Sequence, residues 1–322
     1  MEFMSRFLIT GAAGFIGSHL CEALVKNSQN VIGVDNFNSY YDPDLKRARA
    51  KKLTCPVILA DIRDQAKMKK LISENQITHI IHLAAQAGVR YSLSHPEDYL
   101  ASNIEGFVSV LECLKEFPHI KLIFASSSSV YGNNPQIPFK ENDKTDCPLN
   151  LYGATKKAAE VLAYSYHHLY NISMIGLRYF TVYGPWGRPD MAYYFFTKNI
   201  LDKKPITLFN QGQMKRDFTY IDDIIEGTLA AINFPASYEI FNLGNNNPCD
   251  LMTFVSTLEK LLNKRALIEY APNQKADVPI TFADISKSQK FLNFQPKTSL
   301  EEGLKKFVNW YAEYHQSISL TL

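Results

Sequence analysis

The stretch "YGATK" places a tyrosine and a lysine four residues apart, at Tyr152 and Lys156. It opens a predicted helix, on which residues i and i+4 share one face. The ordinary pKa of a tyrosine is about 10, and a neighbouring ammonium group favours the phenolate form. The pair can therefore act as a general base, although this spacing also arises by chance on helix surfaces.

Four consecutive serines, Ser126–Ser129, precede the tyrosine by about 25 residues. They follow the apolar stretch Lys121–Phe124, which predicts a buried strand with hydroxyl groups at its carboxyl end. A hydroxyl at that point can hydrogen-bond the oxygen that Tyr152 deprotonates and so orient its proton. The other serines are expected to cap backbone groups at the strand end.

A glycine-rich turn near the start, "TGAAGFIG", puts Gly11, Gly14 and Gly17 between a predicted strand and a predicted helix. Glycines there allow a tight reversal and let a pyrophosphate approach the backbone. The helix N-terminus then offers free N–H groups and a positive dipole end to the phosphates. The alternative is a tight turn that binds no ligand. The residues at the ends of the next strands help to distinguish this alternative from a dinucleotide-binding turn.

The second predicted strand ends at Asp35, 18 residues after Gly17. A carboxylate at that position accepts hydrogen bonds from the adenosine ribose and repels a 2′-phosphate, which favours NAD over NADP. Asp61 follows the third strand and suits the adenine, and "HLAAQAG" after the fourth offers small residues beside a flat cofactor. The three strand ends together predict dinucleotide binding.

Short apolar strands alternate with amphipathic helices in the first half of the chain. The predicted strands are Arg6–Thr10, Asn30–Asp35, Pro56–Ala60, His79–Ala85, Lys121–Ser126 and Ser173–Tyr179. The predicted helices are Phe15–Asn27, Pro43–Lys52, Gln65–Asn75, Pro96–Phe117 and Leu149–Tyr170. This alternation predicts an α/β fold with a Rossmann-type, doubly wound parallel sheet.

The regular alternation of predicted strands and helices ends after Gly184. A turn-rich loop there leads to a helix and to a polar, hairpin-like region around Gly212. A helix is expected to open at Asp222, and a last helix to run from Leu300 to about His315. We expect residues 1–180 to form the NAD-binding domain, which can also receive later segments such as 214–243. Residues 181–322 are expected to form mainly a smaller α/β part that binds the substrate.

The composition is that of an ordinary globular protein of 322 residues. A net charge of +2 gives no general attraction to nucleic acid or membranes. The five cysteines are scattered and never spaced as CxxC, and the histidines form no ligand pair, so we expect neither disulfides nor a metal. With no signal peptide and no run of about 20 apolar residues, a cytoplasmic location is expected.

These motifs together resemble the nucleotide-sugar epimerases of the extended short-chain dehydrogenase/reductase family. The stretches that carry the resemblance are "TGAAGFIGSHL", "GVDNFNSYYDP", "HLAAQAGVRYS", "NIEGFVSVLE", "SSSSVYG", "LYGATKK", "LRYFTVYGPWGRPDMA" and "KRDFTYIDDI". They span nearly the whole chain, and the combination looks most like the UDP-glucuronate 4-epimerases. The resemblance implies an isomerase that keeps NAD tightly bound and converts UDP-glucuronate to UDP-galacturonate through a 4-keto sugar.

The resemblance also implies which residues act. Ser127, Tyr152 and Lys156 would be catalytic: Tyr152 takes the proton of the 4-hydroxyl while C4 passes a hydride to NAD, whose charged ring favours the phenolate. Related dehydratases carry an Asp-Glu pair where this chain has Ser128 and Ser129, so elimination lacks its acid and base. The expected cofactor contacts are Gly11, Gly14, Phe15, Ile16, Gly17, Asp35, Asn36, Asp61, Ile62, Leu83, Ala84, Ala85, Gln86, Asn103, Tyr152, Lys156 and Tyr179.

The expected substrate contacts are Ser127, Ser128, Ser129, Tyr152, Thr181, Arg188, Arg216, Gln274 and Asp277. Thr181 stands where UDP-galactose epimerases carry asparagine, and Arg188 is a candidate partner for the C6 carboxylate, or else pairs with Asp190. Arg216 would hold the diphosphate, or be a surface arginine. The chain departs from the family at Ala276, where glycine is usual, and at Gln274, where glucose epimerases carry arginine.

The sequence also allows other functions and substrates. The sugar could be UDP-glucose or UDP-N-acetylglucosamine, and a net dehydrogenase would need exchangeable NAD. A non-catalytic NAD(H)-binding regulator would have no need of Ser127, Tyr152 and Lys156 together. The two long helices, Pro96–Phe117 and Leu149–Tyr170, resemble the family's dimer interface, so a homodimer is expected, with a role in polysaccharide biosynthesis.

Overall fold

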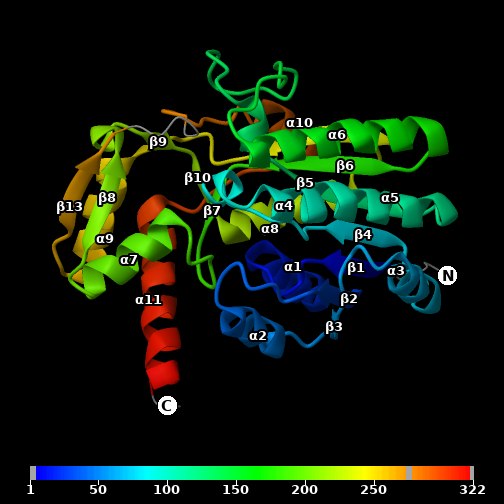
Figure 1. Cartoon of the computed structure of the whole chain (residues 1–322), viewed down its shortest axis with the longest axis horizontal. Coiled ribbons are helices and arrows are strands. Elements are labelled where there is room, and N and C mark those ends of the chain that lie inside the picture. Colours follow the sequence, from blue (N-terminus) through cyan, green and yellow to red (C-terminus); the bar gives the residue numbers. More distant parts are fainter. Residues whose placement is uncertain (1–4, 273–277, 320–322) are drawn as a thin grey trace.

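The computed structural model describes residues 5–272 and 278–319. Seven parallel strands form one sheet in the order β11–β6–β5–β4–β1–β2–β3, which confirms the predicted doubly wound α/β class (Figure 1). The strands are β1 Arg6–Thr10, β2 Asn30–Asp35, β3 Val57–Leu59, β4 His79–His82, β5 Lys121–Ser127, β6 Met174–Tyr179 and β11 Tyr238–Leu243.

Helices cover both faces of this sheet, and each face has its own apolar core. On one face lie α3, α5 and α6, and on the other lie α1 and α8. Their bounds, with that of α2, are α1 Phe15–Lys26, α2 Pro43–Lys52, α3 Gln65–Glu74, α5 Gly106–Glu116, α6 Leu151–Tyr170 and α8 Ile221–Asn233. The order of the strands reverses between β1 and β4, so the loops after these two strands diverge and leave a crevice at the carboxyl edge.

The prediction of one continuous α-helix over Pro96–Phe117 is wrong, because the structure divides this stretch into three helical segments. The chain forms α4 Pro96–Tyr99, then a π-helical turn, η2 Leu100–Glu105, and only then α5. The wider turn directs the Asn103 side chain to the segment after β4, where its amide pairs with the backbone of Gln86. Such π-helical turns occur mostly as local insertions in α-helices and often at functional sites.

The fourth strand also ends earlier than expected, at His82 rather than Ala85. The Leu83 N–H still bonds the carbonyl of Thr10, but the Ala84 N–H turns to the Thr10 hydroxyl instead of a backbone carbonyl. The chain therefore leaves the ladder here, and residues 83–86 turn toward the crevice.

The second part of the chain carries helices and three two-stranded sheets. The pairs are β10 Phe218–Tyr220 with β7 Thr181–Tyr183, β12 Cys249–Asp250 with β9 Lys215–Arg216, and β13 Leu267–Ala271 with β8 Pro205–Phe209. The remaining elements are η1 Tyr91–Leu93, η3 Ser128–Tyr131, α7 Ala192–Leu201, η4 Asn210–Gly212, α9 Leu251–Leu262, α10 Ser286–Leu292 and α11 Leu300–Ser319.

The expected hairpin around Gly212 is absent from the described part of the chain. Asn210, Gln211 and Gly212 all have positive φ and turn the chain, but β8 and β9 then pair with strands that come later in the sequence. The chain returns to the large sheet through α8 and β11, which lie within the stretch 214–243 that was allowed for. The division of the domains at residue 180 itself stays a prediction.

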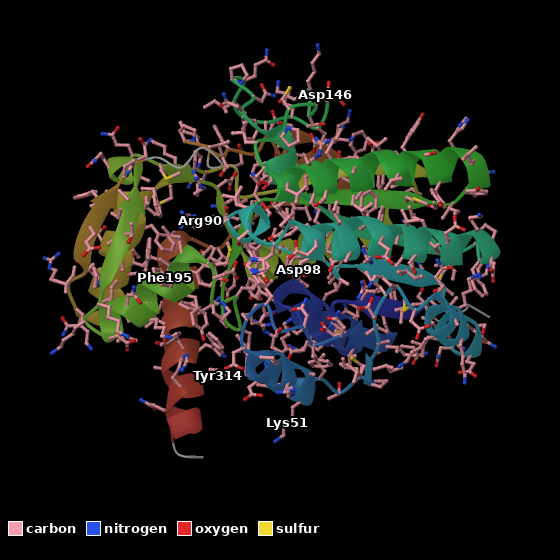
Figure 2. The ribbon with its side chains drawn as sticks, in the orientation of Figure 1. Lys51, Arg90, Asp98, Asp146, Phe195 and Tyr314 are labelled. Carbon is pink, nitrogen blue, oxygen red and sulfur yellow. The ribbon has the colours of Figure 1, made fainter. Side chains whose placement is uncertain are left out.

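The two parts meet beside the segment that follows β4. The guanidinium of Arg90 lies 4.2 Å from the ring centroid of Phe209 on β8, at the centre of the molecule in Figure 2. Close by, the Tyr91 hydroxyl donates to Asp98 at 3.0 Å. Helix α11 runs alongside the second part and ends away from the sheet (Figure 1). Within the residues described, no helix has the length and apolarity to cross a membrane.

Candidate active site

The glycine turn lies at the carboxyl end of β1, and its glycine positions leave no room for side chains. Gly11 has a φ of +72°, and a Cβ atom there would lie 2.7 Å from the backbone nitrogen of Ala84. A Cβ atom on Gly17 would lie 2.1 Å from the Gly11 carbonyl oxygen. The bare turn leads directly into the N-terminus of α1, whose first N–H groups lack helical partners. This cradle fits a pyrophosphate, as the sequence predicted.

Asp35 ends β2 next to this turn and is buried. One carboxylate oxygen accepts the Ala13 N–H at 3.0 Å and the other accepts the Phe37 N–H at 2.8 Å. Burial raises the pKa of Asp35, while these backbone hydrogen bonds and the nearby Lys46 ammonium oppose the rise. The carboxylate thus braces the glycine turn and still lines the pocket, where its free lone pairs can accept ribose hydroxyls.

Asp61 lines the same end of the pocket and is held by two neighbours. Its carboxylate accepts from Arg63 Nε at 2.9 Å and from the Asn36 amide at 3.2 Å. The hydrogen bond from Arg63 is the largest cause of the lowered pKa of Asp61, about 2. Asp61 is therefore ionised across the working pH range.

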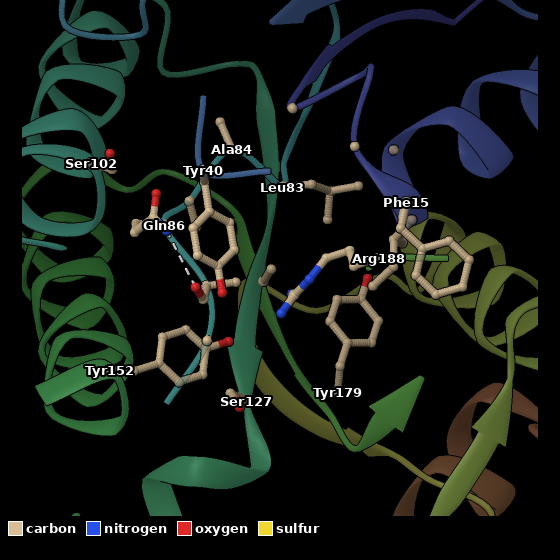
Figure 3. A pocket seen from close by; sticks show the side chains of 18 of the residues that line it. Phe15, Tyr40, Leu83, Ala84, Gln86, Ser102, Ser127, Tyr152, Tyr179 and Arg188 are labelled. Atoms are coloured by element: carbon tan, nitrogen blue, oxygen red, sulfur yellow. Dashed lines mark hydrogen bonds between the residues drawn. The ribbon is translucent and has the colours of Figure 1, made fainter. Parts of the chain in front are cut away.

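One pocket gathers the predicted residues at the carboxyl edge of the sheet (Figure 3). The predicted cofactor residues in its lining are Gly11, Gly14, Phe15, Ile16, Gly17, Asp35, Asn36, Asp61, Ile62, Leu83, Ala84, Ala85, Gln86, Tyr152, Lys156 and Tyr179. The predicted substrate residues in its lining are Ser127, Ser128, Ser129, Tyr152, Thr181 and Arg188.

Asn103 was predicted to contact the cofactor, and this contact stays a prediction. Its side chain does not line the pocket but is buried behind it. The Asn103 carboxamide accepts the Gln86 N–H at 2.8 Å and donates to the Gln86 carbonyl at 3.0 Å. It also donates to the Thr155 hydroxyl on α6 at 3.0 Å. Asn103 thus holds a lining residue in place, which a local pattern could not reveal.

Tyr152 and Ser127 meet where β5 and α6 converge. Burial raises the pKa of Tyr152, whereas a hydrogen bond with Ser127 and the charge of Arg188 lower it, and the charge of Asp190 raises it. Figure 3 shows the Tyr152 ring and the Arg188 guanidinium directed toward the same central space. The phenol therefore has one hydroxyl neighbour and one cation that favour its ionised form.

Lys156 lines the pocket one helical turn after Tyr152. Its ammonium group donates to the carbonyl of Ala125 on β5 at 2.8 Å, and burial lowers its pKa to about 8. The charge of Arg188, which comes 36 residues after Tyr152 in the chain, also lowers the pKa of Tyr152. The spacing of four residues placed Lys156 in the pocket lining, and its predicted catalytic role stays a prediction.

The four serines at the end of β5 make different contacts. Ser126 turns away from Tyr152 and donates to Glu160 of α6 at 2.6 Å. The Ser127 hydroxyl accepts the Ser129 N–H at 3.1 Å and so begins the short helix η3. The expectation that some of the hydroxyls cap the strand end is confirmed, and Ser128 and Ser129 face the pocket beside Ser127.

Arg188 pairs with Asp190, the alternative that the sequence left open. Its Nε and Nη2 atoms donate to the two carboxylate oxygens at 2.9 and 2.6 Å. Asp190 also accepts the Tyr40 hydroxyl at 3.0 Å, which links the loop after β2 to the loop after β7. The Arg188 side chain remains 23% exposed and lines the pocket, so a substrate anion can still reach it.

Three predicted substrate residues lie outside this pocket or outside the described residues. Arg216 on β9 does not line it, and its Nη1 donates to the carbonyls of Lys215 and Pro279 at 2.9 and 3.1 Å. Gln274 and Asp277 fall in the stretch that the structure does not describe. The predicted contacts of these three residues with a diphosphate or a ribose stay predictions.

Several lining residues were not predicted, among them Asn38, Tyr40 and Lys46. Lys46 is buried, donates to the Asn38 carbonyl at 2.7 Å, and has its pKa lowered to about 8 by burial. Tyr40 could have been predicted to line the pocket from its position in the loop that follows Asp35. Lys46 gave no usable signal, because its helix carries four other Lys and Arg residues and periodicity cannot tell which one turns inward.

Comparison with known proteins gives consistent matches. The profile described as "NAD dependent epimerase/dehydratase family" matches residues 7–244. The UDP-glucuronate 4-epimerase 4 of Arabidopsis thaliana is 50% identical over 96% of this chain and 75% of the plant protein. Protein CapI of Staphylococcus aureus is 44% identical over 97% of this chain and 99% of its own length.

Solved structures match with the same coverage. The UDP-glucuronic acid 4-epimerase of Bacillus cereus, in complex with UDP-glucuronic acid and NAD, superposes with a TM-score of 0.90. It is 38% identical, and the match covers 96% of this chain and 99% of that one.

Proposed function

The chain belongs to the NAD dependent epimerase/dehydratase family, and we propose that it interconverts UDP-glucuronate and UDP-galacturonate by inverting C4. The observation that carries the proposal is the meeting of Tyr152, Ser127 and the Arg188 guanidinium in a pocket that also contains the glycine turn. The Arabidopsis thaliana and Bacillus cereus proteins named above are UDP-glucuronate 4-epimerases, which supports the proposal.

NAD is the cofactor, and when bound it accepts the hydride from C4 and returns it to the opposite face of the sugar. The protein supplies the rest. Tyr152 takes the proton of the 4-hydroxyl as a general base, and the Ser127 hydroxyl holds that oxygen. The glycine turn, Asp35 and Asp61 hold the dinucleotide, so the cofactor stays in place through both half-reactions.

The lining of the pocket favours epimerisation over elimination. Among the described lining residues, the carboxylates are Asp35 and Asp61, and both lie beside the glycine turn rather than beside Tyr152. Loss of water from the sugar would need an acid for the departing hydroxyl and a base for the C5 proton. Ser128 and Ser129 offer neither at neutral pH, so oxidation and return of C4 is the reaction that the lining supports.

We assign the sugar carboxylate to the cationic side of the pocket. Arg188 can bind it through charge-assisted hydrogen bonds, with neutral donors from Ser128, Ser129 and Thr181. Holding this carboxylate still also matters chemically, because a 4-keto uronate is a β-keto acid and tends to lose carbon dioxide. Arg216, Gln274 and Asp277 remain our candidates for the nucleotide end.

The remaining proposals concern the protein in its cell. We place it in the cytoplasm, because its five cysteines are free thiols and fit a reducing compartment. We propose a homodimer built on α5 and α6, since large apolar side chains are exposed on α6, including Val161 and Tyr164, both 57% exposed. The product, an activated uronic acid, suits polysaccharide biosynthesis.

The test is a proton NMR time course of purified protein with UDP-glucuronate and no added NAD, and UDP-glucose in a parallel tube. Conversion of the uronate alone is expected. Conversion of UDP-glucose instead would refute the role given to Arg188, since a neutral hydroxymethyl group offers no charge for it. Release of carbon dioxide would refute the argument from the serines, and no reaction with either sugar would refute the function.

A further inference from the structure

Helix α6 is joined to the end of β5 at two consecutive residues. Lys156 donates to the carbonyl of Ala125 at 2.8 Å, and one helical turn later Glu160 accepts the Ser126 hydroxyl at 2.6 Å. Ser127 follows directly on the strand, and Tyr152 lies one turn before Lys156 on the helix. The two contacts therefore set how the tyrosine and its hydroxyl partner approach each other.

Glu160 also reaches the next strand. Its two carboxylate oxygens accept from Nε and Nη2 of Arg178 on β6, both at 2.8 Å, and each side chain is only 4% exposed. Arg178 immediately precedes Tyr179, which lines the pocket. A single carboxylate thus connects α6, β5 and β6 behind the catalytic residues.

The partners of Glu160 are themselves fully engaged. Arg178 Nη1 donates to the Tyr131 hydroxyl at 2.9 Å and to the Glu141 carbonyl at 3.1 Å. The Tyr131 hydroxyl donates to Asn242 on β11 at 2.6 Å. Buried networks of this kind are rigid when every member is satisfied.

Stability alone does not explain this network. Removing two charges from water costs several kcal/mol, and well-packed apolar residues of similar volume are often as stable or more stable than a buried ion pair. What the ionic pair provides and apolar packing does not is direction, because a bidentate guanidinium and carboxylate allow one relative orientation.

We propose that Glu160 is a positioning residue for the epimerisation, holding Ser126 and Arg178 so that Ser127 on β5 meets Tyr152 on α6. Its effect on turnover rests on the proposed function, whereas its effect on the Tyr152–Ser127 contact does not need a substrate. A displacement of about 1 Å at a catalytic contact can cost on the order of 100-fold in rate.

The decisive variant is Glu160→Gln. It keeps the size of the side chain and one accepting oxygen, but removes the charge that orients Arg178. We expect kcat for UDP-glucuronate to fall roughly 10- to 100-fold while KM changes less than about twofold, because positioning of the base is lost and substrate contacts are retained.

The pH profile separates positioning from simple structural support. The hydrogen bond with Ser127 lowers the pKa of Tyr152, so loosening it raises that pKa. Because the phenolate is the active form, the acid limb of kcat should move to higher pH in Glu160→Gln. The other charged or titratable groups around Tyr152 are Lys156 one turn along α6, Arg188 and Asp190 from the loop after β7, and Tyr99 from α4, and the variant replaces none of them.

A matched control is Lys287→Met. Lys287 on α10 pairs with Glu239 on β11 at 2.5 Å, in a partly buried ion pair that does not touch α6. We expect this variant to lower the unfolding temperature but to leave kcat and the acid limb unchanged.

Two further measurements keep the proposal testable. Ser126→Ala removes only the hydroxyl that Glu160 accepts, so it should shift kcat and the acid limb in the same direction but less, and it serves if Glu160→Gln does not fold. The pKa of Tyr152 in the holoenzyme, followed by NMR of ¹³Cζ-labelled tyrosine and assigned with Tyr152→Phe, needs no substrate and should rise in both variants.

The outcomes are distinct. If wild-type protein does not epimerise UDP-glucuronate, the proposed function fails, and the pKa of Tyr152 still decides the role of Glu160. If the variants lower only the unfolding temperature, with kcat, the acid limb and the Tyr152 pKa as in wild type, Glu160 is a structural residue and the positioning role is refuted.

Discussion

Tyr152 is the residue on which the proposed chemistry depends, and its surroundings act in opposite directions. Burial favours the neutral phenol, while Ser127 and Arg188 favour the phenolate. The pKa of the proposed base is thus lowered by a hydroxyl from the strand before it and by a guanidinium from a later loop. Lys156, which the sequence placed beside it, is directed at the Ala125 carbonyl.

Replacing Tyr152 with phenylalanine should abolish epimerisation. General-base catalysis contributes roughly 10²- to 10⁴-fold, so we expect kcat to fall by at least about 100-fold. NAD should remain bound, because the glycine turn and Asp35 are intact. Turnover is measured by NMR, and the cofactor by chromatography of the denatured protein.

Tyr194→Phe is the matched control for this change. Tyr194 is a buried tyrosine on α7 whose hydroxyl contacts His315 at 3.1 Å. Its loss should leave kcat near the wild-type value. Full activity in Tyr152→Phe would exclude this residue as the base.

Arg188 and Asp190 should shift the pH profile in opposite directions. The Arg188 charge lowers the pKa of Tyr152, so Arg188→Met raises it and moves the acid limb of kcat to higher pH. The Asp190 charge raises that pKa, so Asp190→Asn lowers it and moves the acid limb to lower pH.

The measurement is kcat for UDP-glucuronate between about pH 5 and pH 10, at constant ionic strength. Equal profiles for both variants and wild type would show that neither charge acts on Tyr152. Shifts in the same direction would mean that the Arg188–Asp190 pair acts only as a structural unit.

At the scale of elements, the site depends on how strands and helices end. The strand β1 ends in a turn whose glycine positions tolerate no Cβ atom, and the chain after β4 leaves the ladder at the Thr10 hydroxyl. The π-helical turn before α5 directs Asn103 at the segment after β4. These irregular ends, rather than the regular interiors, shape the pocket.

Gly11→Ala should therefore lose the cofactor. Its φ of +72° disfavours any side chain, and the new Cβ atom would lie 2.7 Å from the backbone of Ala84. We expect the NAD content of the purified protein to fall more than about tenfold, since a shift of this turn breaks several phosphate contacts at about 1.5–3 kcal/mol each.

Gly212→Ala is a control with the same backbone penalty. Gly212 has a φ of +75°, but its new Cβ atom would meet only the flexible Met252 side chain at 3.1 Å, far from the pocket lining. It should lower stability by about 1 kcal/mol and leave the NAD content unchanged. Normal NAD content in Gly11→Ala would contradict the assignment of the turn.

At the scale of the whole molecule, the question is what covers α6. Val161 and Tyr164 are exposed on the sheet's α3–α5–α6 side, on a helix whose buried residues pack against the sheet and α5. Apolar side chains at this density on one helix are typical of an interface.

We expect Val161→Glu combined with Tyr164→Glu to convert the proposed dimer to a monomer, because two buried charges without partners oppose association. Light scattering after size-exclusion chromatography gives the mass directly. Phe195→Glu is the control: Phe195 is 44% exposed on α7, in the second part of the molecule (Figure 2), and its change should leave the mass unchanged. A monomeric wild-type protein would refute the dimer.

The sequence by itself determined the features that local patterns encode. These are the glycine turn between a strand and a helix, the acidic residues at the ends of two strands, and the tyrosine and lysine one turn apart on α6. Contacts across long separations were decided only by the tertiary structure, because no spacing encodes which distant side chains meet. The loop after β7 brings the charge of Arg188 to Tyr152, Asn103 bonds the backbone of Gln86 from behind the pocket, and β8 and β9 pair with later strands. The contacts of the Glu160 carboxylate, which is buried between three elements, are also long-range. The sequence shows that residue 160 is a glutamate, but only the tertiary structure shows that it binds Ser126 and Arg178.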